Sequence, residues 1–136
     1  MIENTSTHDA QEDVRNEDIL IWLNGELVHR NEAKVSVYDS GFMLGDGMWE
    51  GMRLYNVVWT FFEEHMDRLF TSREAVSLDS GLTPEDVRAL LNRTAEANGM
   101  TTDAHCSLMI TSSRKAKPVQ HPKLRRAGQT EVTIVE

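Results

Sequence analysis

The side chains best suited to chemistry lie together in the segment EHMDRLFTS, near the start of a stretch with helical spacing. His65, Arg68 and Ser72 follow one another at intervals of three and four residues, so a helix makes them neighbours on one face. A guanidinium pairs with two phosphate oxygens at once, and the imidazole and hydroxyl beside it add polar groups. The pattern makes Arg68 a candidate phosphate receptor; the alternative is a surface ion pair with Glu64 or Asp67.

A second candidate is the glycine-rich stretch DSGFMLGDGMWEGMRLY, residues 39–55, which surrounds Trp49. Glycine at this density in a β-rich region indicates tight turns or close approach by another group. The simpler interpretation is a bulged turn between strands. The functional interpretation is that the missing side chains leave room for a ligand beside Trp49.

Composition limits the class of protein. The chain has 136 residues, 40% of them hydrophobic, and a net charge of −8, which fits one domain with one core. Its longest apolar run, residues 19–23, is far shorter than the roughly 20 residues of a membrane-spanning helix. The N-terminus lacks the pattern of a secretory signal and Cys106 has no second cysteine to pair with, so we expect a cytoplasmic protein.

Common catalytic and metal-binding signatures are missing from the sequence. It holds no Walker loop and no HExxH, CxxC or GxSxG motif. The five histidines are scattered, and His105 beside Cys106 lacks the spacing of a zinc site. We therefore assign no metal site and no catalytic residue.

Charge is concentrated at two places along the chain. Residues 1–18 carry six acids and one arginine, and we expect them to form a disordered acidic arm outside the fold. Residues 114–126 carry six basic side chains and no acid. The pattern argues against nucleic-acid binding there, because no aromatic side chains are interleaved to stack on bases, and a solvated loop explains the run.

Periodicity predicts an α+β fold, with a mainly antiparallel sheet and two helices packed on one face. One helix should span residues 63–78, and a second should begin at the Thr83-Pro84 capping signal and end at Asn98-Gly99. Asn24-Gly25 predicts a tight hairpin turn, and Asn56 a second. The predicted strands cover residues 19–23, 26–28, 35–38, 48–55, 57–62, 104–111 and 130–136.

Three segments together resemble one known family. The sequences NGELV, AKVSVYDSGFMLGDGMWEGMRLYN and EEHMDRLFTSREAVSL are similar to the N-terminal part of the class IV aminotransferases, the fold type IV pyridoxal-phosphate enzymes. That family includes branched-chain aminotransferases, D-amino acid aminotransferases and aminodeoxychorismate lyases. The resemblance covers residues 19–136 and implies that they form the small N-terminal domain of such an enzyme, commonly a homodimer.

The resemblance also implies roles for individual residues. Arg68 takes the place of the arginine that holds the phosphate of pyridoxal 5′-phosphate, with His65 behind it. Trp49 stands where the family carries an aromatic residue facing the substrate side chain, and Gly51 lies on the same wall. Leu44 takes a further position in the substrate pocket or at the subunit interface.

Two departures from the family pattern affect the expected activity. Where relatives commonly have Thr-Arg-Gly, this chain has Thr111 followed by two serines, which leaves the substrate class open. The family's cofactor-linked lysine belongs to a second, larger domain, and no lysine here matches its motif. We therefore expect branched-chain amino acid transamination with 2-oxoglutarate in the complete enzyme and inactivity in the isolated chain. The alternatives are a D-amino acid aminotransferase, an aminodeoxychorismate lyase, or a non-catalytic dimerisation module anchored by Phe42, Leu44 and Trp49.

Overall fold

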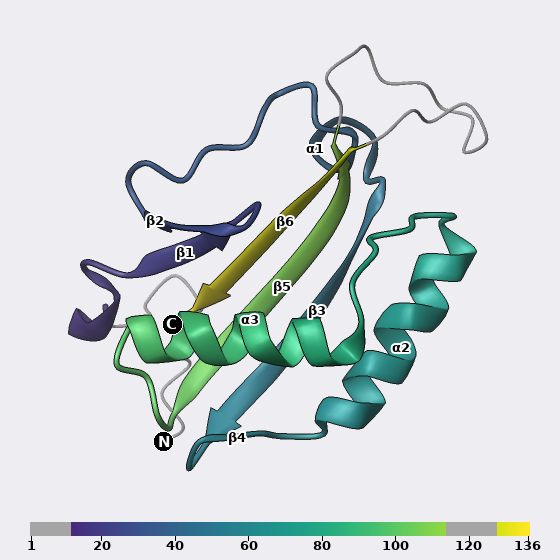
Figure 1. Ribbon diagram of the computed structural model, residues 1–136. Coiled ribbons are helices and arrows are strands. Elements are labelled where there is room, and N and C mark those ends of the chain that lie inside the picture. Colours follow the sequence, from purple (N-terminus) through teal and green to yellow (C-terminus); the bar gives the residue numbers. More distant parts are fainter. Residues whose placement is uncertain (1–11, 114–127) are drawn as a thin grey trace, which may run out of the picture.

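The computed structural model describes residues 12–113 and 128–136, and its strands form one antiparallel sheet (Figure 1). The strand order is β2-β1-β6-β5-β3-β4. The strands are β1 (Leu20–Leu23), β2 (Glu26–His29), β3 (Gly47–Tyr55), β4 (Val58–Trp59), β5 (Ala104–Ser113) and β6 (Gly128–Val135). The helices are α1 (Ser40–Leu44), α2 (Phe62–Ala75) and α3 (Pro84–Ala97).

The centre of the sheet is formed by β3, β5 and β6, and its buried face carries the core. β3 pairs with β5 without interruption from Gly47 to Leu54. Strand residues alternate between the two faces of a sheet, so one face of β5 presents four side chains that are at most 1% exposed. These are the four side chains predicted to share a face: Ala104, Cys106, Leu108 and Ile110.

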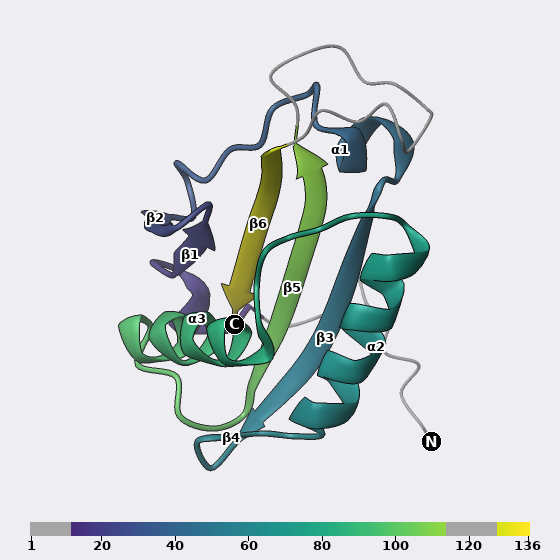
Figure 2. The ribbon, with the colours of Figure 1, turned by 45° about the vertical axis from the view of Figure 1, so that its right-hand side comes forward.

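Helices α2 and α3 both cover this buried face. Figures 1 and 2 show α3 crossing β5 and β6, and α2 running beside β3. The prediction of an α+β fold with two helices on one face of an antiparallel sheet is thus confirmed. No helix in the described part of the chain has the length and apolar character needed to cross a bilayer.

Helix α3 forms as its sequence predicts. Thr83 accepts a hydrogen bond from the backbone N–H of Asp86, and the Asp86 carboxylate accepts one from the backbone of Thr83 in return. This capping box, with Pro84 in the first turn, satisfies amide groups that a helix start leaves unpaired. The buried side of α3 consists of Val87, Leu90, Leu91, Thr94 and Ala95, the stripe expected from helical spacing.

Helix α2 begins one residue earlier and ends three residues earlier than predicted. Its N-cap, Phe61, has a φ of 53° in the left-handed region, which ends the extended chain before it. The predicted strand over residues 57–62 is therefore reduced to β4, Val58–Trp59. Phe62, Met66 and Leu69 are buried against the sheet as predicted.

The predicted strand over residues 35–38 is wrong. This stretch is irregular, and Val37 and Tyr38 are 66% and 60% exposed. The bulged turn is wrong too, since residues 40–44 form α1, which Asp39 caps and Gly45 ends at a φ of 69°. Alternation of apolar and polar residues supports a strand only where a neighbouring strand offers hydrogen bonds.

Part of the N-terminal segment is attached to the fold. Residues Val14–Asn16 form a 3₁₀ turn, and Arg15 donates to the backbone carbonyls of Thr102 and Asp103 at 3.3 and 3.0 Å. For these residues the expectation of an arm outside the fold does not hold, because the guanidinium ties them to the turn before β5. Residues 1–11 and the basic run at 114–126 lie outside the described residues.

Candidate functional site

Glu50 is a buried carboxylate in the middle of β3. Its neighbours on the same face, Met48 and Met52, belong to the hydrophobic core, and its own side chain is only 3% exposed. A buried carboxylate without partners has a high free energy, so the fold must supply donors to it.

Arg68 and His65 of α2 are those donors. Arg68 Nε donates to Glu50 Oε1 at 2.7 Å, and Arg68 Nη2 donates to Oε2 at 2.6 Å. His65 Nδ1 lies 2.7 Å from Oε2. An ionised carboxylate only accepts, so Nδ1 carries the hydrogen in this contact. Helical spacing of three residues brings both side chains to the same carboxylate.

The charge of Glu50 is maintained by these contacts. Burial raises the pKa of Glu50, but the hydrogen bonds from Arg68 and His65 outweigh burial and bring that pKa below its ordinary value. The bond with Glu50 in turn raises the pKa of Arg68. At neutral pH the site therefore holds an ionised carboxylate and a charged guanidinium in one fixed arrangement.

The outer edge of the Arg68 guanidinium remains available. Nε and Nη2 point to Glu50, and Nη2 also lies 3.4 Å from His65 Nδ1, whereas Nη1 makes no hydrogen bond with any residue that the structure describes. The side chain is 65% exposed, although its carboxylate partner is buried. The free N–H groups suit an anion with two oxygens, such as a phosphate, so this donor set fits the predicted role of Arg68.

Trp49 and Gly51 lie on the opposite face of β3 from Glu50, because adjacent strand residues point to opposite faces. Trp49 is 57% exposed. A Cβ on Gly51 would stand 2.9 Å from Trp49 Cη2 and 3.1 Å from His105 Nε2. The space that the glycine leaves is thus filled by the indole and the imidazole of this chain.

Leu44 lies at the end of α1, which packs near β5. Gly41 approaches the sheet so closely that a Cβ there would stand 2.3 Å from Thr111 Cγ2. Leu44 itself is 44% exposed. The structure therefore brings Trp49 together with Gly51, and Arg68 together with Glu50. No hydrogen bond or ion pair within residues 12–113 and 128–136 joins Arg68 to either Trp49 or Leu44.

Two residues of this region were missed by sequence reasoning, Glu50 and Asp39. The ion-pair partner of Arg68 is Glu50, and neither Glu64 nor Asp67 of its own helix takes that part. The available signal was the alternation in β3, which places Glu50 between buried residues and therefore requires a cation nearby. The signal for Asp39 was weaker: aspartate is a preferred N-cap residue, and here it stands directly before the short helix α1.

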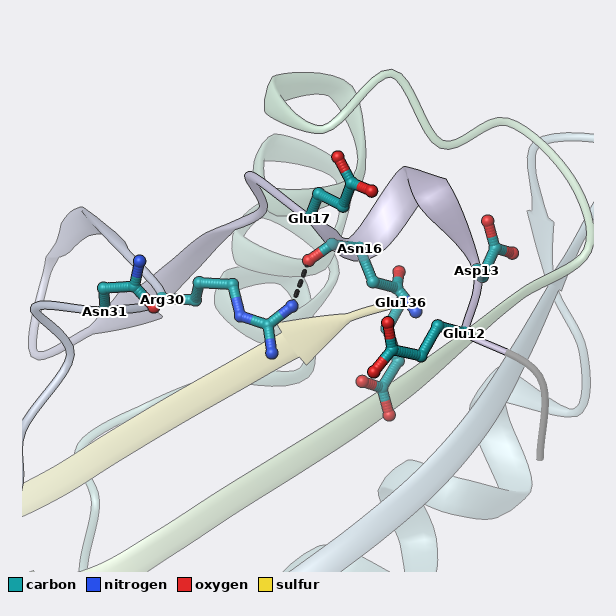
Figure 3. Close-up of a pocket in the computed structure, with 7 residues that line it drawn as sticks. All are labelled: Glu12, Asp13, Asn16, Glu17, Arg30, Asn31 and Glu136. Carbon is teal, nitrogen blue, oxygen red and sulfur yellow. Dashed lines mark hydrogen bonds between the residues drawn. The ribbon is translucent and has the colours of Figure 1, made fainter. Parts of the chain in front are cut away.

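A hollow of about 500 Å³ lies at another part of the surface (Figure 3). Arg30 crosses it and donates to the backbone carbonyl of Asn16. Its remaining lining is mostly acidic: Glu12, Asp13, Glu17 and Glu136, with Asn31. Within the described residues no three histidine, cysteine or carboxylate side chains are grouped to hold a metal ion.

Fold and site together define the class: a small α+β domain with an exposed arginine that is anchored by a buried carboxylate. The sequence profile of the amino-transferase class IV family matches residues 47–135, which include both β3 and α2. The chain belongs to this family.

Relatives with different named activities are similar to this chain. The branched-chain-amino-acid aminotransferase-like protein 1 of Arabidopsis thaliana is 37% identical over 121 residues, which are 89% of this chain and 22% of that protein. A D-alanine aminotransferase of Listeria innocua is 36% identical over 103 residues, which are 76% of this chain and 34% of that protein. The chain thus spans about a fifth to a third of these relatives.

A solved structure shows the same likeness in three dimensions. The branched-chain aminotransferase of Thermoproteus uzoniensis, crystallised with norvaline, superposes with a TM-score of 0.77 and 27% sequence identity. The match covers 88% of this chain and 40% of that one.

Proposed function

We propose that residues 19–136 form the small N-terminal domain of a pyridoxal-phosphate-dependent aminotransferase and that Arg68 binds the cofactor phosphate. The exposed outer edge of the Arg68 guanidinium, held in place by Glu50, carries this proposal. When bound, pyridoxal phosphate supplies the electron sink for amino-group transfer. The contribution of this chain is to bind and orient the phosphate end.

In this proposal Trp49 faces the substrate side chain with Gly51 on the same wall, and Leu44 contacts the substrate or the neighbouring subunit. Their support is the exposure of Trp49 and Leu44, which are 57% and 44% accessible, and the close packing of the indole over Gly51. An exposed indole buries much apolar surface when a substrate side chain or another subunit covers it.

For the complete enzyme we propose transamination of branched-chain amino acids with 2-oxoglutarate, as a homodimer in the cytoplasm. The similarity to branched-chain aminotransferases supports this substrate class. A D-amino acid substrate is the alternative, supported by the similarity to D-alanine aminotransferase. The isolated chain is proposed to be inactive, because no lysine of its sequence matches the motif of the cofactor-linked lysine. Lys34, the one lysine among the described residues, is exposed in the loop after β2.

The test has a binding arm and an activity arm. Pyridoxine 5′-phosphate is titrated into the chain and into Arg68→Ala, with pyridoxine as the control that lacks phosphate. We expect binding that requires both the phosphate and Arg68; equal binding by the variant would overturn the role of Arg68. Glutamate formation from leucine and 2-oxoglutarate, with pyridoxal phosphate present, would overturn the proposed inactivity.

A dimerisation module is the second candidate function. The observation that favours it is the exposure of large apolar side chains on α1: Phe42 at 74%, Met43 at 51% and Leu44 at 44%. Clusters of this kind commonly mark interaction surfaces. Light scattering tests it, since a strictly monomeric chain at high concentration would exclude self-association.

A further inference from the structure

We infer that Glu50 is a positioning residue that sets the orientation of the Arg68 guanidinium toward a phosphate. This inference rests on the proposed function of Arg68. It assigns to a buried carboxylate a role in binding an anion that the carboxylate itself does not touch.

The contact between the two residues leaves the guanidinium one orientation. Two carboxylate oxygens meet Nε and Nη2 on a single edge, at 2.7 and 2.6 Å. Two parallel hydrogen bonds fix the plane of the group as well as its position, which a single bond does not. The edge opposite to Glu50 is the one presented to solvent.

Glu50 is itself held in place by its surroundings, so its carboxylate can fix the position of the arginine. Its side chain is 3% exposed, and β3 pairs with β5 through the Glu50–Leu108 register. His65 Nδ1 donates to Oε2 at 2.7 Å, which fixes the carboxylate from a second direction. Without this contact, Arg68 on a helix surface would occupy several rotamers. Binding an anion would then have to overcome the conformational entropy that the side chain loses when it is restricted to one rotamer.

Charge and orientation have opposite effects on binding here. A carboxylate beside Arg68 repels a phosphate, so electrostatics alone predicts that removal of the Glu50 charge strengthens phosphate binding. Positioning predicts that the same removal weakens binding. The sign of the change in dissociation constant therefore separates the two explanations.

Glu50→Gln is the variant that makes this distinction. Glutamine keeps the shape and one oxygen acceptor, but its amide NH₂ group cannot accept from Arg68 or His65. Pyridoxine 5′-phosphate is titrated into the 136-residue chain and followed by NMR, again with pyridoxine as the control. We expect its dissociation constant to rise about fivefold, the effect of losing one hydrogen bond. Glu64→Gln removes the same charge from an exposed position on α2 and should leave binding unchanged or slightly tighter.

The Arg68 side chain supplies a readout that does not depend on the ligand. Its Nε–Hε resonance in the unliganded chain should be shifted and protected from exchange with water, and Glu50→Gln should move it toward the values of a free arginine. Binding by Glu50→Gln that is as tight as wild type, or tighter, would overturn the inference. So would an unchanged Arg68 resonance.

The outcomes also distinguish this inference from the proposed function. If wild type binds no better than Arg68→Ala, the phosphate-binding role fails, and the Arg68 resonance still decides whether Glu50 orients the arginine. If Glu50→Gln does not fold, Glu50→Asp replaces it, because aspartate keeps the charge but is one methylene too short for both bonds. Weaker binding by Glu50→Asp at unchanged net charge would support positioning, and unchanged binding would overturn it.

Discussion

Asp39 accepts a hydrogen bond from Thr130 across 91 residues of chain, with 2.8 Å between Oδ2 and the threonine Oγ1. The same oxygen accepts from Thr111 Oγ1 at 2.9 Å, and Oδ1 accepts from the backbone amides of Gly41 and Phe42. One buried carboxylate thereby caps α1 and joins it to β5 and β6. We therefore expect the position of α1, and of Leu44 at its end, to depend on this residue.

Replacement of Asp39 by alanine should lower the free energy of unfolding by about 2–4 kcal/mol, because it removes a helix cap and leaves the buried hydroxyl of Thr130 and the half-buried hydroxyl of Thr111 without this acceptor. Urea denaturation followed by circular dichroism measures this loss. The control Asp67→Ala removes an exposed aspartate and should change stability by no more than about 0.5 kcal/mol. A loss for Asp39→Ala no greater than for the control would show that the carboxylate does not hold α1 in place.

The turn between β3 and β4 contains a strained residue. Asn56 and Val57 have φ values of 47° and 64°, the left-handed pair that the first hairpin builds from Asn24 and Gly25. A β-branched residue is unfavourable there, and Val57 is 72% exposed, so its side chain contributes little packing. Val57→Gly should therefore raise stability by about 0.5–1 kcal/mol.

Thermal and urea denaturation of the Val57 variant can be compared with those of Val58→Gly. Val58 lies in β4 opposite Tyr55, where glycine weakens a strand, so this control should be destabilised. Equal destabilisation of both variants would show that Val57 is not strained.

Gly51→Ala should displace the Trp49 indole with only a small loss of stability. An added Cβ would stand 2.9 Å from Trp49 Cη2, too close for van der Waals contact, and the far end of the ring can move toward solvent. The Trp49 Nε1–H resonance in a two-dimensional NMR spectrum reports this movement. Ser107→Ala, at the cross-strand partner of Gly51, should leave the resonance in place. If Gly51→Ala leaves it unmoved as well, the indole does not pack over residue 51.

The ion pair of Glu50 should make the protein sensitive to acid. Because hydrogen bonds from Arg68 and His65 bring the folded-state pKa of Glu50 below its ordinary value of 4.5, the unfolded chain binds more protons at acid pH. The contribution of the Glu50 ion pair to the free energy of unfolding is complete above that ordinary pKa. It is lost as the pH falls through the lower pKa of the folded state. The stability advantage of wild type over Glu50→Gln should thus shrink as the pH is lowered from 6 toward 3, about the range over which carboxyl groups titrate.

Urea denaturation at a series of pH values measures this difference. Glu64→Gln serves as the matched control, since Glu64 is exposed and forms no ion pair with the residues that the structure describes, and its difference from wild type should vary less with pH. A difference between wild type and Glu50→Gln that stays constant with pH would contradict the assigned electrostatics.

The sequence by itself determined the elements whose signals are local. The capping residues Thr83 and Asp86 determine where α3 begins, and the alternation along β5 determines its buried face. Asn24-Gly25 favours positive φ at both turn positions and so determines the first hairpin. The guanidinium of Arg68, with polar neighbours at helical spacing, likewise indicates an anion receptor from residue types alone.

Only the tertiary structure decided which distant groups meet. Alternation shows that Glu50 points inward, but the packing of α2 on β3 selects Arg68 and His65 as its partners. The five-residue helix α1 is joined to the sheet by the carboxylate of Asp39, which caps the helix and also reaches β5 and β6. Residues 35–38 alternate as a strand would, yet no strand of the described chain lies beside them, and hydrogen bonds between strands are what a sheet requires.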